Sequence, residues 1–170
     1  MRQEYSRYVF LACPIPQSHA KTNDVNTQLI ESPDKWALFE HLPSPTYAKG
    51  CFCILGDAAH ATTPHCGAGA GFAIEDAYIL AGLLSPDIIQ STSDIERAFR
   101  VYDESRRPRS QELVRRSHSQ GMTFDMQGED GVKLTEEGVR ESLTNNMAWV
   151  WDVDLAAVLK DAKIRLRNFG

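Results

Sequence analysis

The residues best suited to chemistry are one carboxylate and three closely spaced glycines in the first half of the sequence. Asp57 follows a short apolar run, and Gly67, Gly69 and Gly71 come soon after it. The carboxylate can accept hydrogen bonds from a ligand that carries hydroxyl groups. The glycines leave the backbone bare, so a ligand can approach its N–H groups closely. Together they predict a site for a hydroxylated ligand with negative charge.

Two elements would have to position these residues. The run Cys51–Leu55 is short, apolar and bounded by Gly50 and Gly56, which favours a strand buried on both faces. Such a strand would deliver Asp57 to the carboxyl edge of a sheet, where open α/β sheets bind ligands. The glycine loop should lead into a helix over about Phe72–Leu84, and the positive N-terminal end of a helix favours an anion.

The rest of the chain is expected to be mainly helical. Aromatic and β-branched residues predict one strand at Tyr5–Cys13, and loose alternation predicts a second at Trp36–Leu42. A helix capped by Ser93 or Asp94 should run to Ser119, with a kink or a new start at Pro108. Two further helices are expected, one from Thr135 to Asn146 and one after Asp154. On the helix after the glycine loop, helical spacing puts four residues on one face: Ala73, Ala77, Leu80 and Leu84.

The whole segment from Gly56 to Ala77 reads G-D-A-A-H-x3-P-x2-G-x-G-x5-E-D-A. This pattern resembles the second flavin signature of group A flavoprotein monooxygenases, and salicylate-hydroxylase-like enzymes in particular. A long motif of this kind is much stronger evidence than a single glycine pattern. The resemblance covers about Asn26–Leu166, through Asp34–Leu38, Tyr47–Gly50, Tyr102 with Arg106–Arg109, and Trp149–Asp152.

The resemblance implies FAD as the cofactor and gives roles to individual residues. Asp57 would bind the ribityl chain, Pro64 would lie beside the isoalloxazine ring, and backbone N–H groups from Gly67 to Phe72 would face the pyrimidine edge of the flavin. The implied activity inserts one oxygen atom of O₂ into a small aromatic substrate, with NAD(P)H as the reductant. No catalytic residue and no metal ligand is assigned. The expected cofactor-binding residues are Gly56, Asp57, Pro64, Gly67, Ala68, Gly69, Ala70, Gly71 and Phe72.

The chain departs from the family pattern at its start. The family opens with a strand, G-x-G-x-x-G and a helix that hold the FAD pyrophosphate, and this sequence has no such motif. We therefore expect an α/β protein, α+β in this fragment, with an FAD/NAD(P)-binding-type fold that lacks the N-terminal Rossmann βαβ unit and ends in helices. The expected divisions are a remnant of the substrate-domain sheet at 1–49, part of the FAD-binding domain at 50–120 and a helical segment at 121–170. A partner chain could supply the missing half.

Other interpretations of the same residues stay open. A small zinc module could be formed by Cys51, Cys53, His60, His65 and Cys66, although C-x-C followed by H-x4-H-C is not a standard ligand spacing. His60 is expected to be a structural residue that packs the turn after Asp57. The arginines of the 106–109 run are expected to cover a solvated helix face, and Trp36, Trp149 and Trp151 to be core or interface anchors. The chain could also be an inert remnant of a monooxygenase that is retained for protein contacts.

Composition excludes several classes of function. The formal net charge is −5 and no Lys/Arg-rich run is present, so nucleic acid is not an expected partner. No apolar stretch has the length of a membrane span, and the N-terminus does not resemble a secretory signal. Cys51 and Cys53 alternate with apolar residues and are expected to be small buried hydrophobes in a reducing compartment. We therefore expect an intracellular, cytoplasmic protein.

Overall fold

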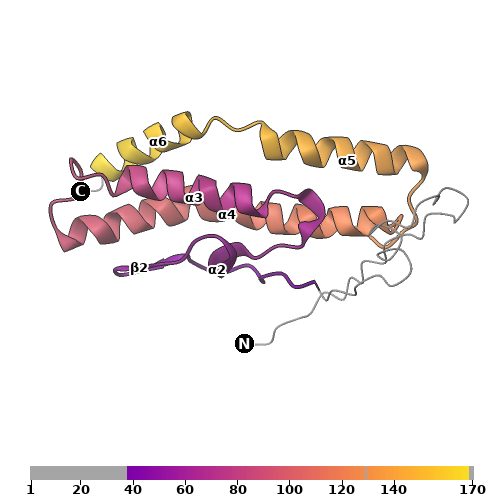
Figure 1. Ribbon diagram of the computed structural model, residues 1–170, viewed down its shortest axis with the longest axis horizontal. Coiled ribbons are helices and arrows are strands. Elements are labelled where there is room, and N and C mark those ends of the chain that lie inside the picture. The colour runs from indigo at the N-terminus through magenta and orange to yellow at the C-terminus, as the bar shows by residue number, and fades with distance from the viewer. Residues whose placement is uncertain (1–37, 129, 169–170) are drawn as a thin grey trace, which may run out of the picture.

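The computed structural model of the chain describes residues 38–128 and 130–168, and the side chain of residue 147 is not described. Its elements are arranged in three layers (Figure 1). Helices α3 and α4 lie side by side in the middle, α5 and α6 lie on one side of this pair, and α2 and the strands lie on the other. In chain order the elements are β1 (Ala48–Lys49), β2 (Phe52–Cys53), α2 (Asp57–His60), η2 (Pro64–Cys66), α3 (Gly69–Leu83), α4 (Thr92–Phe124), α5 (Glu136–Trp151) and α6 (Leu155–Arg167).

The long helix α4 is the element against which the other layers pack. Ser91 caps it, since its hydroxyl accepts a hydrogen bond from the N–H of Asp94, and the helix then runs for 33 residues. Pro108 lies inside this single element on its exposed side, so it does not divide the helix. The cap is thus two or three residues earlier than expected, and the helix continues past Ser119 to Phe124.

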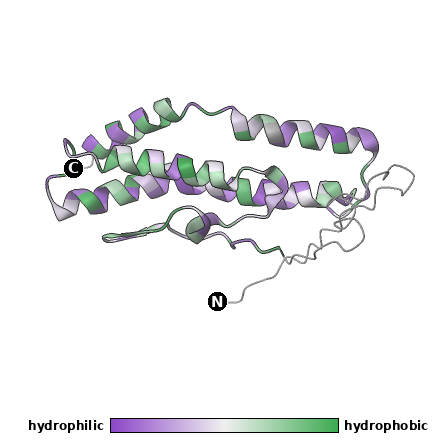
Figure 2. Cartoon of the chain, in the orientation of Figure 1, coloured by the Kyte–Doolittle hydropathy of each residue, from purple (hydrophilic) through white to green (hydrophobic). Residues whose placement is uncertain are grey.

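Helix α3 confirms the expected helix after the glycine loop, but it begins earlier and buries a different face. Its buried residues are Phe72, Glu75, Asp76, Ile79 and Leu83, whereas Ala77 is exposed. Two carboxylates therefore point inward, and Ile74 and Tyr78 remain exposed on the outer side. Figure 2 shows hydrophobic residues along the whole helix. A helix that is apolar on its outer side as well is usually covered by another layer.

The two C-terminal helices start at the expected caps. The Thr135 hydroxyl accepts from the N–H of Gly138 at 3.2 Å, and the Asp154 carboxylate accepts from the N–H of Ala157 at 2.9 Å. Helix α5 continues to Trp151, five residues beyond Asn146. Helix α6 packs against α3, where Ala162 and Leu166 join a core that includes Tyr47, Ile79, Leu83, Ala98, Val101 and Tyr102.

The expected doubly buried strand is wrong. Residues 48–53 form a small antiparallel hairpin in which Ala48 pairs with Cys53 and Lys49 with Phe52. Phe52 is 83% exposed and Cys51 is exposed as well, so the expected burial of Cys51 is also wrong, and Cys53 is only half-buried. The physical reason is that the hairpin has no third strand among the described residues and packs only one side against α4, which leaves Phe52 uncovered.

The described chain is therefore mostly helical with one small two-stranded sheet. Leu38–Leu42, the described part of the second expected strand, is not in a strand, and Tyr5–Cys13 lies outside the described residues. No parallel βαβ unit is present in the part that the structure describes. None of the helices in these described residues has both the length and the hydropathy that a membrane span requires.

Candidate functional site

The turn that carries Asp57 requires glycine at its first position. Gly56 has φ 56° and ψ −141°, a conformation that side chains at Cα disfavour. A Cβ atom there would also lie 3.3 Å from the Cβ of Ala73 in α3. Asp57 then opens the short helix α2 with its side chain exposed, while His60 at its end is buried. The turn is thus packed against the beginning of α3, and its carboxylate faces outward.

The glycine loop passes through a short 3-10 helix before α3 begins. Gly67 ends η2 with φ 60°, the left-handed conformation that favours glycine, and its N–H donates to the carbonyl of Pro64. The N–H of Phe72 donates to the carbonyl of Ala68. Residues 67 and 72 therefore use their N–H groups internally. The predicted approach of backbone N–H groups to a flavin therefore depends on the amides from Ala68 to Gly71.

The N-terminus of α3 is open to a ligand. Ala68 stands at the cap position and provides no side-chain hydrogen bond, and the first turn contains no acidic residue. The first N–H groups of a helix lack partners within the helix and give it a partial positive charge. At this end those groups belong to Ala68, Gly69, Ala70 and Gly71, and both Ala70 and Gly71 are exposed. The backbone here is suited to an anionic or hydrogen-bond-accepting group.

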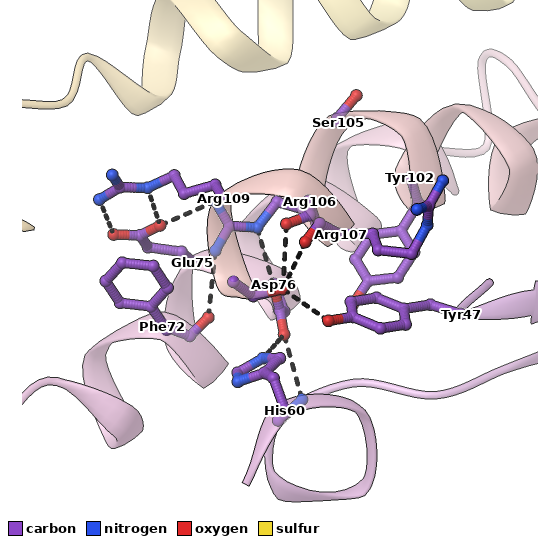
Figure 3. A network of polar contacts seen from close by, with 12 residues as sticks. Tyr47, His60, Phe72, Glu75, Asp76, Tyr102, Ser105, Arg106, Arg107 and Arg109 are labelled. Atoms are coloured by element: carbon purple, nitrogen blue, oxygen red, sulfur yellow. Dashed lines mark hydrogen bonds and ion pairs between the residues drawn. The ribbon is translucent and has the colours of Figure 1, made fainter. Parts of the chain in front are cut away.

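Asp76 joins the turn, α3 and α4 in one buried network (Figure 3). Its Oδ2 accepts from the Gly56 N–H at 3.1 Å and is 2.6 Å from His60 Nε2, and its Oδ1 accepts from Arg106 Nε at 2.8 Å. Burial by itself would raise the pKa of Asp76. The hydrogen bonds from His60, Arg106 and Gly56 outweigh this effect and hold the pKa below its usual value. The prediction that His60 packs the turn is confirmed, since it is 1% exposed.

A second set of charged residues ties the C-terminal segment to α3. Arg109 donates two hydrogen bonds of 3.0 Å to Glu75, and another of 3.1 Å to the carbonyl of Val150. Its guanidinium also lies 4.5 Å from the ring centre of Phe72 and 4.8 Å from that of Trp149. This stacking is the usual cation–π geometry. The end of α5 is thereby held beside the glycine loop.

The expectation that the 106–109 arginines cover a solvated face is wrong for two of them. Arg106 is completely buried, with Nη1 2.7 Å from Glu75 and Nε bonded to Asp76. Arg109 has a side chain only 15% exposed. The sequence contained a signal for this burial. Arginines on one predicted helix and the acidic pair Glu75–Asp76 on another can form ion pairs inside a protein. Arg107, by contrast, is half-buried and pairs with Asp103 on its own helix.

Side chains of α4 also hold the loop before α3. The Ser117 hydroxyl donates to the carbonyl of Thr63 at 2.5 Å and accepts from the N–H of Cys66 at 3.3 Å. Gln120 donates to the carbonyl of His65 at 3.0 Å. Cys66 itself is buried, and burial raises the pKa of its thiol. A neutral buried thiol is a poor nucleophile, so Cys66 acts as a packing residue.

The predicted site residues occupy one continuous segment but differ in exposure. Asp57, Pro64, Gly67, Ala70 and Gly71 are exposed, whereas Ala68 and Gly69 are half-buried and Gly56 and Phe72 are buried.

A cavity of about 210 Å³ lies between this loop and the end of α5, and it is lined by Cys66, Gly67, Ala68, Gly71, Phe72, Glu75, Val150 and Trp151. A larger one of about 390 Å³ lies between residues 40–43 and α4, and no predicted site residue lines it. Among the described residues no group of three His, Cys, Asp or Glu side chains is arranged to hold a metal ion.

Comparisons with known proteins connect this segment to one family. The family described as FAD binding domain matches residues 17–117. Salicylate hydroxylase of Pseudomonas putida is 36% identical over 139 residues, which cover 82% of this chain and 32% of that protein. The 6-methylsalicylate 1-monooxygenase of Aspergillus terreus is 37% identical over 135 residues, 79% of this chain and 30% of that one. A solved salicylate hydroxylase substrate complex has a TM-score of 0.71 and 36% identity over 81% of this chain and 34% of its own. This chain thus spans about a third of the length of these relatives.

Proposed function

Because this chain belongs to the FAD-binding domain family, we propose that the segment from Gly56 to Leu83 contacts the ribityl chain and the isoalloxazine ring of FAD in a flavin-dependent monooxygenase. Asp57 accepts hydrogen bonds from ribityl hydroxyl groups, and Pro64 lies beside the ring. The N–H groups of Ala68, Gly69, Ala70 and Gly71 face the pyrimidine edge. The similarity to salicylate hydroxylase over most of the chain supports this assignment.

The open N-terminus of α3 is the observation that carries the proposal. It has no capping side chain and no acidic residue in its first turn, and its first residues are Gly69, Ala70 and Gly71. The positive end of a helix stabilises negative charge on a bound group, and residues this small let a flat ring approach the backbone. Asp57 is exposed in a turn that packs against Ala73 of the same helix. One ligand with a polar chain and a ring would engage both.

The reaction of the complete protein is proposed to be hydroxylation of a small aromatic substrate with O₂ and NAD(P)H. The relatives named salicylate hydroxylase and 6-methylsalicylate 1-monooxygenase support a phenolic acid as the substrate class. FAD, when bound, supplies the redox chemistry and the activation of oxygen. The residues of this chain orient the cofactor and stabilise charge at its pyrimidine edge.

The outer side of α3 is proposed to be covered by the rest of the FAD-binding domain. Ile74 is 70% exposed and Tyr78 is 45% exposed, and Ala70, Ala77 and Ala81 are exposed beside them. An apolar helix face of this kind marks an interface. The occupant we propose is the layer that holds the FAD pyrophosphate, either in the same polypeptide or in a partner chain. The division into 1–49, 50–120 and 121–170 belongs to this proposal.

A second candidate function is that of an inert family member retained for protein contacts. The same exposed face of α3 favours it, because an interaction surface needs no cofactor. The two candidates differ in one property, which is whether the glycine loop binds flavin.

Titration of the chain with FAD, followed by amide NMR spectra, tests the proposed function. FAD should shift the resonances of Asp57 and of Gly69, Ala70 and Gly71. The change Asp57→Ala should weaken binding by about 1.5–3 kcal/mol, the value of a charge-assisted hydrogen bond. The matched control is Asp87→Ala, which removes an exposed carboxylate beyond the other end of α3. Equal FAD affinity for the two variants would refute the assigned role, and an absence of shifts at the loop would favour the inert alternative.

A further inference from the structure

The position of Asp57 depends on a residue that lies twenty positions further along the chain. Gly56, directly before it, has a backbone conformation that favours glycine, and its N–H donates to Asp76 Oδ2 at 3.1 Å. His60, at the other end of α2, is 2.6 Å from the same oxygen. One carboxylate oxygen therefore binds both ends of the turn that presents Asp57.

The other oxygen of Asp76 anchors this turn to the interior. Oδ1 accepts from Arg106 Nε at 2.8 Å, and Arg106 on α4 is completely buried. Asp76 itself has no exposed surface and lies in α3, the helix whose first residues form the glycine loop. A buried group with several good hydrogen bonds has little freedom to move. Asp76 thus fixes the turn to both α3 and α4 by hydrogen bonds.

We propose that Asp76 is the positioning residue for the Asp57 carboxylate, which it aligns with the open N-terminus of α3 by holding Gly56 and His60. This inference rests on the proposed function, because Asp76 would influence flavin contact only through Asp57. Asp76 has no exposed surface, so it would act on a bound flavin only through the turn. A purely structural role would instead change FAD binding through general loosening of the fold.

A double-mutant cycle separates the two roles. FAD dissociation constants are measured by amide NMR titration for the unchanged chain, Asp57→Ala, Asp76→Asn and the double variant. Asp76→Asn keeps the size of the side chain but removes its charge and one acceptor atom. We expect Asp76→Asn to weaken FAD binding about tenfold when Asp57 is present, and less than about twofold when residue 57 is alanine. Effects that act through one group are not additive. Equal effects in both backgrounds would overturn the proposal.

Asp103→Asn provides the matched control. Asp103 is a carboxylate of α4 that is also buried, and it accepts from the N–H of Tyr47 at 2.8 Å and from Arg107 at 2.9 Å. Its loss should destabilise the fold, but it should weaken FAD binding equally with and without Asp57. If the effect of Asp103→Asn on FAD binding depended on Asp57 as strongly as that of Asp76→Asn, the coupling would be a general structural effect and the proposal would be overturned.

A second readout decides the case in which FAD does not bind. The amide of Gly56 should be protected from hydrogen exchange in the unchanged chain and should lose that protection in Asp76→Asn, together with shifted resonances of Asp57. Asp103→Asn should leave these signals unchanged. If Asp57 resonances stay the same in Asp76→Asn, the positioning role is refuted, whereas FAD titrations without shifts at Asp57 refute only the proposed function.

Discussion

At the scale of single residues, Arg106 carries a full charge into the interior and has two carboxylate partners there. Its Nη1 lies 2.7 Å from Glu75 and its Nε 2.8 Å from Asp76. Removing one member of a buried ion pair leaves an uncompensated charge. We expect Arg106→Ala to lower the free energy of unfolding by about 3–5 kcal/mol, as measured by urea denaturation. Arg100→Ala, which removes a 61% exposed partner of Glu96, should change it by less than about 1 kcal/mol.

The same network predicts a dependence of stability on acid. The pKa of Asp76 is lowered in the folded chain, because hydrogen bonds to His60, Arg106 and Gly56 outweigh the opposite effect of burial. A depressed pKa contributes stability above the unfolded value of about 3.9, and this contribution is lost as the pH falls through the folded value. Unfolding free energies measured from pH 6 down to pH 2 should therefore decrease below about pH 4. In Asp76→Asn this decrease should be smaller, and an identical pH profile for the two proteins would contradict the assignment.

Sequence could predict the residues of the loop but not the network behind it. Asp57 and the glycines are recognisable because their types and spacing form a motif, and the conformations of Gly56 and Gly67 agree with the need for glycine there. Asp76 and Arg106 belong to the same stretches, yet their burial depends on which face α3 turns toward α4. The ion pairs of Glu75 and Asp76 with Arg106 form on that face, and hydrophobic spacing cannot reveal it because α3 has large apolar residues on its exposed side as well.

At the scale of elements, α3 and α6 approach closely at one glycine. A Cβ atom on Gly82 would lie 2.6 Å from Leu159 Cδ1, whereas one on Gly71 of the same helix would meet nothing within 4 Å. Overpacking of this kind costs about 1–3 kcal/mol, while both changes gain similar helix propensity. Gly82→Ala should therefore be less stable than Gly71→Ala by about 1–3 kcal/mol in thermal or urea unfolding. Equal stability of the two variants would show that Leu159 moves aside without cost.

The elements also show where sequence patterns succeed. The helices were predictable because Ser, Thr and Asp caps and helical spacing are local signals, as Thr135 and Asp154 confirm. The run Cys51–Leu55 does contain strand β2, but its expected burial on both faces was wrong, because burial of a strand depends on neighbours that are distant in sequence. Phe52 has a side chain of a type that is usually buried in a core, and it is nevertheless 83% exposed.

At the scale of the whole molecule, the described elements offer only part of a binding surface for a long cofactor. The loop from Pro64 to Gly71 and the Asp57 turn would contact the ribityl chain and one edge of the ring, and binding has to offset about 4–15 kcal/mol of lost translational and rotational freedom. We expect the 170-residue chain to release FAD on desalting and to show no hydroxylase activity. The visible spectrum after desalting measures this. A flavin band near one equivalent per chain would show that the chain holds FAD unaided.

The stacking around Trp149 has an optical consequence. The guanidinium groups of Arg109 and Arg116 lie 4.8 and 4.5 Å from the centre of its indole ring, and the ring stacks with Phe72 at 6.0 Å. A flavin at the glycine loop would be near enough to accept excitation energy from this indole. Trp151 is close in sequence but is 74% exposed. The emission of Trp149 would therefore be a built-in optical reporter of what occupies the loop, and a Trp149→Phe variant would identify its share of the signal.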